Sequence, residues 1–424
     1  MDLPAGFAEL MHALLGKEEY GRLVAALAEE VPASIRLNPF KYDKVCPPLA
    51  KDQFKPVPWC GNGYYLNRRP AFTFDPLFHA GCYYVQEASS MFLEQVMRQF
   101  VTDPVCVLDL CAAPGGKATH VRSLLPGGSL LVANEVIRSR SQVLAEYMIK
   151  WGHPDVVVTQ NDPADFRELE GFFDVIVADV PCSGEGMFRK DPDAMGEWSL
   201  EQVEVCRQRQ WRIIADIWPC LGPGGLLVYS TCTYNIKENE ENVSRMVKEL
   251  GAEVLRVDVP VEWNVTGNLF NDAFPVYRFL PHKTKGEGFF LAVLRKESGK
   301  PFDRSGSREA ALRKWLRVIK PSGIEPGVRK GGDILPSHAQ AMSLALQPGL
   351  YPVCELTYEH AIAYLRREAI VLDASVARGY VLVTYRSVPL GFVKNVCNRA
   401  NNLYPHDWRI RSRFLPDEIS VLNI

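Results

Sequence analysis

The stretch Val107-Leu108-Asp109-Leu110-Cys111-Ala112-Ala113-Pro114-Gly115-Gly116-Lys117 is an apolar run that leads into a glycine-bearing loop. A short apolar run of this kind is typical of a strand buried in a parallel sheet. Residues 118–125 follow with a helical pattern, so the loop connects the carboxyl end of a strand to a helix. Ligands of open α/β sheets bind at such ends, where glycines let the backbone approach closely and the helix start offers unpaired N–H groups.

Apolar runs and helical stretches alternate from residue 104 to residue 296. We expect strands at 105–110, 129–133, 155–159, 173–178, 225–229 and 288–294. This alternation predicts a doubly wound, Rossmann-like α/β domain. The loop after the first strand is neither the GxGxxG pattern of dinucleotide-binding proteins nor a phosphate-binding P-loop, so it does not identify a ligand by itself.

Two cysteines follow two neighbouring strands of this domain. Cys182 lies in Asp179-Val180-Pro181-Cys182-Ser183-Gly184, and Cys232 lies in Tyr229-Ser230-Thr231-Cys232-Thr233. A lone cysteine is most often a small, inert apolar residue. Two cysteines at strand ends beside a cofactor loop instead predict covalent catalysis, in which one thiol attacks the substrate and the other helps to release it.

Acidic residues stand at the ends of the next three strands. Glu135 is placed to bind ribose hydroxyls, and Asp162 is placed to contact an adenine edge. Asp179 ends the fourth strand. Each acid taken singly is as readily a helix cap or a turn residue. Together with the glycine loop they predict a nucleoside-binding cleft. S-adenosylmethionine fits this cleft better than NAD, because it has no phosphates and because nearby thiols suit methyl transfer.

The predicted chemistry is methyl transfer to carbon C5 of a pyrimidine. C5 is a poor nucleophile until a thiolate adds to C6, and the C5 proton must then leave so that the thiol can be released. Such a reaction needs an activated thiolate and a general base. The sequence offers Cys232, Cys182 and Asp179 for these tasks.

Three motifs together resemble the Nol/Nop/Sun family of RNA 5-methylcytosine methyltransferases. They are the loop at 110–117, the Pro-Cys motif at 179–184 and the Thr-Cys motif at 230–234, and Gln86-Glu87-Ala88-Ser89-Ser90 is similar to the family's motif before the cofactor strand. The resemblance covers roughly residues 30–296. It implies that Cys232 attacks C6 and that Cys182 assists product release.

The resemblance also implies the binding residues. Asp179 would bind the cytosine ring, and the cofactor contacts would come from Cys111 to Lys117, Glu135, Asp162 and Asp179, with Arg140 a further candidate. The role of Lys117 stays open, because it could orient the site, lower the pKa of a thiol or be an ordinary loop lysine. DNA cytosine methyltransferases use the Pro-Cys cysteine as nucleophile, so the Thr-Cys motif favours RNA as the substrate.

The two ends of the chain have features expected of RNA-binding parts. Residues 390–394 and 402–405 are similar to the tail of bacterial ribosomal members of the family, which implies a PUA-like domain and small-subunit (16S) rRNA as substrate. Residues 301–424 carry 17 Lys and Arg against 11 Asp and Glu, which suits a nucleic-acid partner or an ordinary solvated surface. Basic and aromatic residues alternate near the start, with the same two interpretations; they are Arg36, Lys41, Lys44, Lys51, Lys55, Trp59, Tyr64, Tyr65, Arg68 and Arg69.

The expected organisation has four parts. Residues 1–80 would form two helices and a small α+β RNA-recognition module, 81–296 the methyltransferase domain, 297–307 a linker and 308–424 a β-rich PUA-like region. We expect residues 84–91 to open a helix. Two alternatives to rRNA methylation remain, namely methylation of tRNA and a non-catalytic RNA-binding role in ribosome assembly.

Composition sets the remaining expectations. The chain has 424 residues, 47% of them hydrophobic, and a formal net charge of -2, as expected of a globular protein with more than one domain. Its 11 cysteines include no CxxC pair, so we expect a reducing compartment, no disulfide framework and no metal site. With no leader pattern and no long apolar stretch, we expect a cytoplasmic protein, a monomer, without membrane contact.

Overall fold

The computed structural model describes residues 3–42, 54–270, 273–302, 307–330, 333–397, 399–412 and 421–422. Lys44, Lys51 and residues 303–306 of the expected linker lie outside these described residues. Among the residues described, no helix has both the length and the apolar character that crossing a membrane requires.

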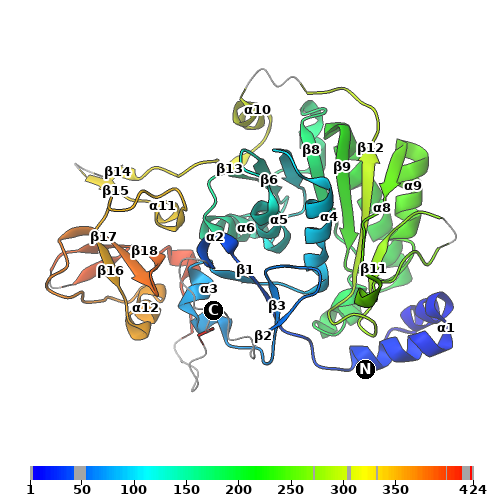
Figure 1. Ribbon diagram of the computed structural model, residues 1–424, viewed down its shortest axis with the longest axis horizontal. Helices are drawn as coiled ribbons and strands as arrows, with labels where there is room; N and C mark the ends of the chain where they lie inside the picture. The colour runs from blue at the N-terminus through cyan, green and yellow to red at the C-terminus, as the bar shows by residue number, and fades with distance from the viewer. Residues whose placement is uncertain are drawn as a thin grey trace.

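A nine-stranded mixed sheet forms the centre of the molecule (Figure 1). Its strands run in the order β10-β12-β9-β8-β5-β6-β7-β13, and β11 pairs with β12 outside this path. The parallel strands are β5 (Cys106–Asp109), β6 (Leu130–Asn134), β7 (Val156–Thr159), β8 (Phe173–Asp179) and β9 (Leu221–Thr231). The antiparallel strands are β10 (Ala252–Leu255), β11 (Tyr277–Phe279), β12 (Phe289–Lys296) and β13 (Val318–Lys320).

All six strands expected from the sequence are present, and the doubly wound α/β prediction is confirmed. From β5 the chain adds β6 and β7 on one side, and then β8 and β9 on the other. The winding therefore reverses between β5 and β8. In open α/β sheets the ligand crevice lies at the carboxyl ends of the strands where the winding reverses.

Helices cover both faces of this sheet. One face packs against α4 (Leu93–Phe100), α5 (Gly116–Leu124) and α6 (Arg138–Trp151), and the other against α8 (Leu200–Ile217), α9 (Glu240–Leu250) and α10 (Arg308–Trp315). Strand β8 illustrates how one strand contributes to the apolar cores on both faces. Val175 and Val177 belong to the first apolar core, whereas Ile176 and Ala178 belong to the second, because successive strand residues point to opposite faces.

The N-terminal part contains helix α1 (Ala5–Leu27) and a four-stranded sheet. Helix α1 breaks at Gly16, where φ is +77°, so the two expected helical stretches are present. The sheet has the order β2-β3-β1-β4. Its strands are β1 (Ser34–Leu37), β2 (Phe54–Pro56), β3 (Gly63–Leu66) and β4 (Tyr83–Val85), with short helices α2 (Pro39–Tyr42), η1 (Phe72–Phe74) and α3 (Pro76–His79).

The expectation of a helix opening at residues 84–91 was wrong at its start. Tyr83–Val85 forms strand β4 and pairs with β1, as suits a run of aromatic and β-branched residues. The helical part begins with η2 (Ser89–Phe92) and continues as α4. Gln86 to Ser90 therefore link the N-terminal sheet to the central domain.

Four of the residues proposed as RNA contacts are buried, namely Arg36, Lys41, Trp59 and Tyr65. Arg36 donates to Thr119 Oγ1 at 2.6 Å, and Lys41 donates to the carbonyl of Lys150 at 2.6 Å. Trp59 is 2% exposed. These side chains hold the N-terminal sheet on the central domain, whereas Lys55, Arg68 and Arg69 are exposed.

The C-terminal part is β-rich, as expected. Its four-stranded sheet contains β16 (Val353–Glu355), β17 (Gly379–Tyr385), β18 (Val388–Asn395) and β19 (Ala400–Asn402). It packs with the N-terminal sheet, because Ile35 and Leu37 share one apolar core with Val381 and Leu390. The remaining elements are α7 (Pro192–Glu197), α11 (His338–Met342), α12 (Tyr358–Leu365), β14 (Val328–Lys330), β15 (Asp333–Leu335), η3 (Pro163–Glu168), η4 (Glu185–Met187), η5 (Trp218–Cys220), η6 (Val261–Trp263) and η7 (His406–Trp408).

The expected domain boundaries at residues 80, 296 and 307 stay a prediction. Strand β13 lies beyond the expected linker and nevertheless pairs with β7 of the central sheet.

Candidate active site

The glycine loop joins β5 to α5 at the carboxyl ends of the strands, where the winding reverses between β5 and β8. Gly115 has φ +125°, which other residues rarely adopt, and a Cβ there would lie 3.2 Å from Tyr147. The loop is held to the next strand by the N–H of Ala112, which donates to the carbonyl of Asn134 at 2.8 Å. Helix α5 begins at Gly116 with no side-chain cap, so its first N–H groups suit an anion.

The acids expected at the next strand ends occupy different surroundings. Glu135 is buried after β6 and accepts a hydrogen bond from the N–H of Ile137 at 2.9 Å. Arg140 lies 3.5 Å from Glu135 and donates to the carbonyl of Ala113 at 2.9 Å, which ties this acid to the glycine loop. Asp162 caps η3 through the N–H of Ala164, so its cofactor contact stays a prediction.

Asp179 ends β8 and carries two polar contacts. Lys117 Nζ lies 2.8 Å from one carboxylate oxygen, and Ser230 Oγ donates to the other at 2.7 Å. Burial would lower the pKa of Lys117, but the Asp179 carboxylate outweighs it, and the pKa is raised. Lys117 is therefore a cation paired with Asp179 at the carboxyl ends of β5 and β8.

The two cysteines meet at the carboxyl ends of β8 and β9. Cys182 Sγ and Cys232 Sγ lie 3.1 Å apart, and both side chains are half-buried. The Cys232 contact and burial raise the pKa of Cys182 well above its usual value. Cys182 is therefore a protonated thiol at neutral pH, and it can donate to the sulfur of Cys232.

A buried carboxylate beneath the Cys182 loop was missed by sequence reasoning. Glu238 is fully buried, and burial raises the pKa of its carboxyl. Ser183 Oγ also donates to it. Its other donors are the N–H of Ser183 at 3.0 Å and the side-chain amides of Gln210 and Asn235 at 2.7 and 2.8 Å. Glu238 thus fixes the residue that follows Cys182.

Glu185 does the same for the segment after Cys232, and it too was missed. It is fully buried and accepts from the N–H groups of Tyr234 and Asn235 at 2.7 and 2.9 Å. The Asn235 side chain donates to Glu185 at 2.9 Å and to Glu238 at 2.8 Å. One amide therefore joins the two carboxylates and, through them, the two cysteine loops.

We expect Glu238→Gln to destabilise the protein and to slow its reaction. The new side-chain NH₂ group would face the N–H of Ser183 or the amide of Asn235, which are donors themselves. One hydrogen bond would be lost, and the free energy of unfolding would fall by about 1–3 kcal/mol. A displaced Cys182 loop should lower kcat roughly tenfold, which corresponds to about 1.4 kcal/mol. Urea unfolding and initial rates test this, with the exposed Glu249→Gln as control. Normal values for both would contradict the positioning role.

Asp109 is a further residue that sequence reasoning did not assign. It ends β5, is fully buried, and neither carboxylate oxygen has a hydrogen-bond partner among the described residues. Burial and then the charge of Asp179 raise its pKa to about 8. The carboxyl is therefore protonated at neutral pH in the ligand-free protein, and a cationic ligand beside it would favour its ionised form.

We expect Asp109→Asn to reduce the dependence of stability on pH. The pKa of this carboxyl is 3.8 in the unfolded chain and about 8 in the folded protein. Between these pH values the folded state therefore binds more protons than the unfolded state. Stability then falls as pH rises from about 4 to about 8. Urea midpoints of the ligand-free protein should fall less steeply in Asp109→Asn than in the wild type. The exposed Asp103→Asn is the control, and equal slopes would contradict the burial argument.

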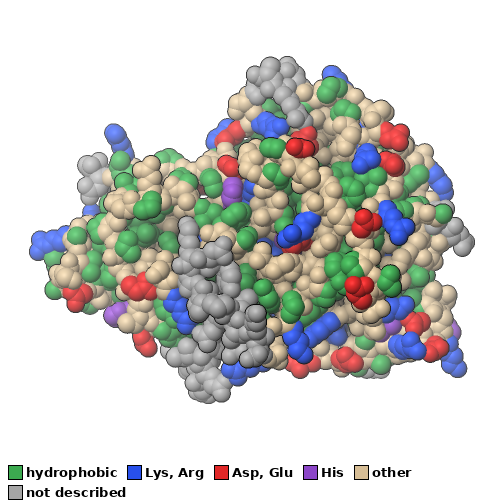
Figure 2. Space-filling model, viewed as in Figure 1, with side chains coloured by type: hydrophobic (Ala, Val, Ile, Leu, Met, Phe, Trp, Pro, Cys, Tyr) green, Lys and Arg blue, Asp and Glu red, His purple; other side chains and the backbone are tan. Residues whose placement is uncertain are grey.

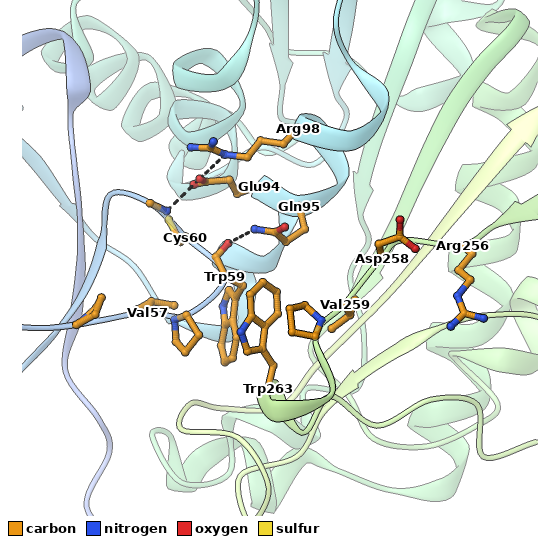
Figure 3. A pocket seen from close by; sticks show the side chains of 14 residues that line it. Val57, Trp59, Cys60, Glu94, Gln95, Arg98, Arg256, Asp258, Val259 and Trp263 are labelled. Carbon is orange, nitrogen blue, oxygen red and sulfur yellow. Dashed lines mark hydrogen bonds and ion pairs between the residues drawn. The ribbon is translucent and has the colours of Figure 1, made fainter.

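A separate hollow of about 960 Å³ lies on the flank of the domain (Figure 3). Trp59 and Trp263 make an edge contact in it with ring centres 6.1 Å apart, and Arg98 pairs with Glu94 above them. None of the expected catalytic or cofactor-binding residues lines this hollow.

Next to this hollow is the one side-chain group, within the described ranges, whose ligand atoms are close enough to share a metal ion. Its members are Cys60, Glu94 and His120. Glu94 already accepts hydrogen bonds from Arg98, from the N–H of Gly61 and from His120, whose nitrogen lies 3.1 Å away. The group is thus held by its own hydrogen bonds.

Comparison with known proteins bears on the whole chain. The model for the 16S rRNA methyltransferase RsmB/F family matches residues 100–295. The model for the N-terminal domain of 16S rRNA methyltransferase RsmF matches 3–88, and that for the methyltransferase RsmF PUA domain matches 351–410.

Individual relatives align over most of their length. Ribosomal RNA small subunit methyltransferase F of Aliivibrio fischeri is 31% identical, over 94% of this chain and 95% of its own. The protein of that name from Escherichia coli O17:K52:H18 is 32% identical, over 83% and 84%.

Solved structures agree on the fold. NSun6 from Pyrococcus horikoshii with SFG has a TM-score of 0.58 at 23% identity, over 70% of this chain and 98% of its own. A methyltransferase homolog protein from Pyrococcus horikoshii has a TM-score of 0.57 at 28% identity, over 68% and 94%. The matches to models and relatives, on top of the shared fold, place the chain in the 16S rRNA methyltransferase RsmB/F family.

Proposed function

We propose that this protein transfers a methyl group from S-adenosylmethionine to C5 of a cytosine in 16S rRNA, through a covalent bond between Cys232 and C6. The observation that carries the proposal is the pair of thiols 3.1 Å apart beside the Asp179–Lys117 ion pair. The names of its relatives support rRNA of the small subunit as the substrate.

The residues at the crevice fit S-adenosylmethionine, which supplies an electrophilic methyl group when it is bound. Its carboxylate matches the uncapped start of α5 at Gly116. Its cationic groups match the buried carboxylates of Asp109 and Glu135. The proposed contacts of the loop from Cys111 to Lys117 and of Asp162 complete this site.

The side chains divide the work on the base. The Cys232 thiolate adds to C6, and the electron pair of the C5–C6 double bond moves to C5, which becomes nucleophilic. Asp179 holds the polar edge of the ring, and its ion pair with Lys117 fixes the position of its carboxylate. After methylation a base from solvent takes the C5 proton, the C–H electron pair forms the C5–C6 double bond again, and the bond to Cys232 breaks with its electron pair left on the sulfur. The protonated thiol of Cys182 donates a proton to the departing sulfur.

The setting of the reaction is part of the proposal. We propose that the protein acts as a cytoplasmic monomer on the small ribosomal subunit or its precursor. The intact pair of cysteines and the complete glycine loop favour this over a non-catalytic assembly factor. Methylation of tRNA is the second candidate, because the chemistry of the base is the same in both RNAs.

Labelled methyl transfer by the purified protein tests the proposal. Isolated 16S rRNA, small subunits and total tRNA are each incubated with labelled S-adenosylmethionine, and the label is mapped to a nucleoside. Label in 5-methylcytidine of 16S rRNA, free or in subunits, supports the proposal. Label in tRNA alone would show that tRNA, and not 16S rRNA, is the substrate. Label in neither RNA would contradict the proposed reaction.

A further inference from the structure

A groove of about 440 Å³ lies between the end of β3 and the loop at 281–286. Two acidic residues, Glu29 and Glu30, are among the residues that line it. Figure 2 shows Lys and Arg side chains along the lower edge of the molecule, over β3 and α1. Four exposed basic side chains line the groove, and they are Arg68, Arg69, Lys283 and Lys285.

The two basic walls of the groove are tied to each other. The hydroxyl of Tyr65 on β3 donates to the carbonyl of Lys285 at 2.5 Å. The Nζ of Lys285 lies 4.7 Å from the centre of the same tyrosine ring. Arg69 likewise lies over the ring of Phe72, at 5.5 Å. The charged ends of both side chains thus lie over aromatic rings, in the geometry of a cation–π contact.

The groove is also connected to the two thiols. Arg189, which follows the Cys182 loop, lines the groove and donates to the carbonyl of Gly286 at 2.8 Å. It forms a buried ion pair with Glu287 at 2.7 Å. On the same loop, the N–H of Gly186 donates to the carbonyl of Cys232 at 2.8 Å. The basic loop is thereby held in a fixed position relative to both cysteine loops.

We propose that this groove binds the phosphate backbone of the RNA next to the target cytosine. The inference rests on the proposed function, and it names where the substrate strand lies. Phosphate contacts by Lys and Arg supply most of the affinity for a nucleic acid and set its register, while the base itself is read elsewhere. Lys283 lies 3.0 Å from Glu19, but an exposed pair of this kind is weak and readily yields to a phosphate.

Charge reversal tests the groove. The variant Arg69→Glu/Lys283→Glu/Lys285→Glu should bind a 16S rRNA fragment at least tenfold more weakly than the wild type, and its KM for RNA should rise. The slope of log K against log salt should fall by about two or more, since each phosphate contact contributes about 0.7 to 0.9. The affinity for S-adenosylmethionine should not change.

Two exposed lysines serve as the matched control. Lys248 lies near the end of α9, and Lys314 lies on α10 at the opposite side of the molecule from β3 (Figure 1). Lys248→Glu/Lys314→Glu should leave the RNA affinity within twofold of the wild type. If the groove variant fails to fold, the single variants Arg69→Ala, Lys283→Ala and Lys285→Ala replace it, and each should lower the salt slope by about one.

The outcomes separate this inference from the proposed function. The inference would be overturned if the groove variants kept the RNA affinity and the salt slope of the wild type. It would also be overturned if the control variant lost as much RNA affinity as the groove variants. Weakened binding by the groove variants in a protein that methylates no rRNA would leave the groove in place and refute the proposed function. Full methylation with unaltered RNA binding in the groove variants would refute the groove alone.

Discussion

Replacing Cys232 by alanine should abolish methyl transfer while leaving cofactor binding intact. The thiol of Cys232 is the proposed nucleophile, and C5 does not take up a methyl group until a thiolate has added to C6. The sulfur of Cys182 lies 3.1 Å from that of Cys232, and burial and the charge of Glu238 still raise its pKa when the Cys232 contact is removed, so Cys182 does not take over the attack. We expect kcat to fall by roughly 10³-fold or more.

Single-turnover methylation and cofactor titration measure the two halves of this prediction. Cys354→Ala, in the C-terminal sheet, is the matched control and should keep the wild-type rate. If the Cys232→Ala protein still methylates RNA over several turnovers, Cys232 is not the nucleophile. Loss of cofactor binding in that variant would mean that the substitution had disturbed the crevice rather than the chemistry.

Replacing Cys182 by alanine should have a different result, namely accumulation of a covalent protein–RNA adduct. Attack by Cys232 does not need Cys182, whereas release of Cys232 needs a proton at the departing sulfur. The protonated thiol of Cys182 is the group in contact with that sulfur. Without it the adduct should form at a normal rate and decay slowly, so turnover stops after one round.

Denaturing gel electrophoresis with labelled rRNA detects the adduct. The double variant Cys182→Ala/Cys232→Ala is the decisive control, because it should form none. Absence of any denaturant-stable adduct in Cys182→Ala, in the presence of cofactor and rRNA, would contradict the division of labour between the two thiols. An adduct that persists in the double variant would assign the attack to another residue.

The parts of the fold that the sequence predicts are those with a local cause. Strands β5 to β9 are buried on both faces, so each appears as an apolar run. Strands β10, β11 and β13 escaped prediction because they lie at or near the margins of the sheet, where a strand does not need to be an apolar run. The helix expected at Tyr84 gave way to a strand because β1 pairs with it.

The candidate site divides in the same way. Asp179 ends β8, Cys182 lies in the loop after it, and Cys232 comes directly after β9, so their meeting at one edge follows from the parallel order of the sheet. Glu185 and Glu238 could not be found in this manner. Glu238 holds Ser183, a residue 55 positions away along the chain, and only the packed structure brings the two together. Asp109 lies in the stretch 107–117 that predicts the cofactor loop. Its complete burial, however, results from the packing of the whole domain and cannot be predicted from the adjacent residues in the sequence.

Bisulfite sequencing of small-subunit rRNA tests the central claim most directly. RNA is taken from cells that lack this gene and that are complemented with either the wild-type protein or Cys232→Ala. We predict one or a few cytosines that are protected with the wild-type protein and unprotected with Cys232→Ala or with no protein. An identical pattern of protected cytosines in all three samples would contradict the claim that this protein methylates 16S rRNA.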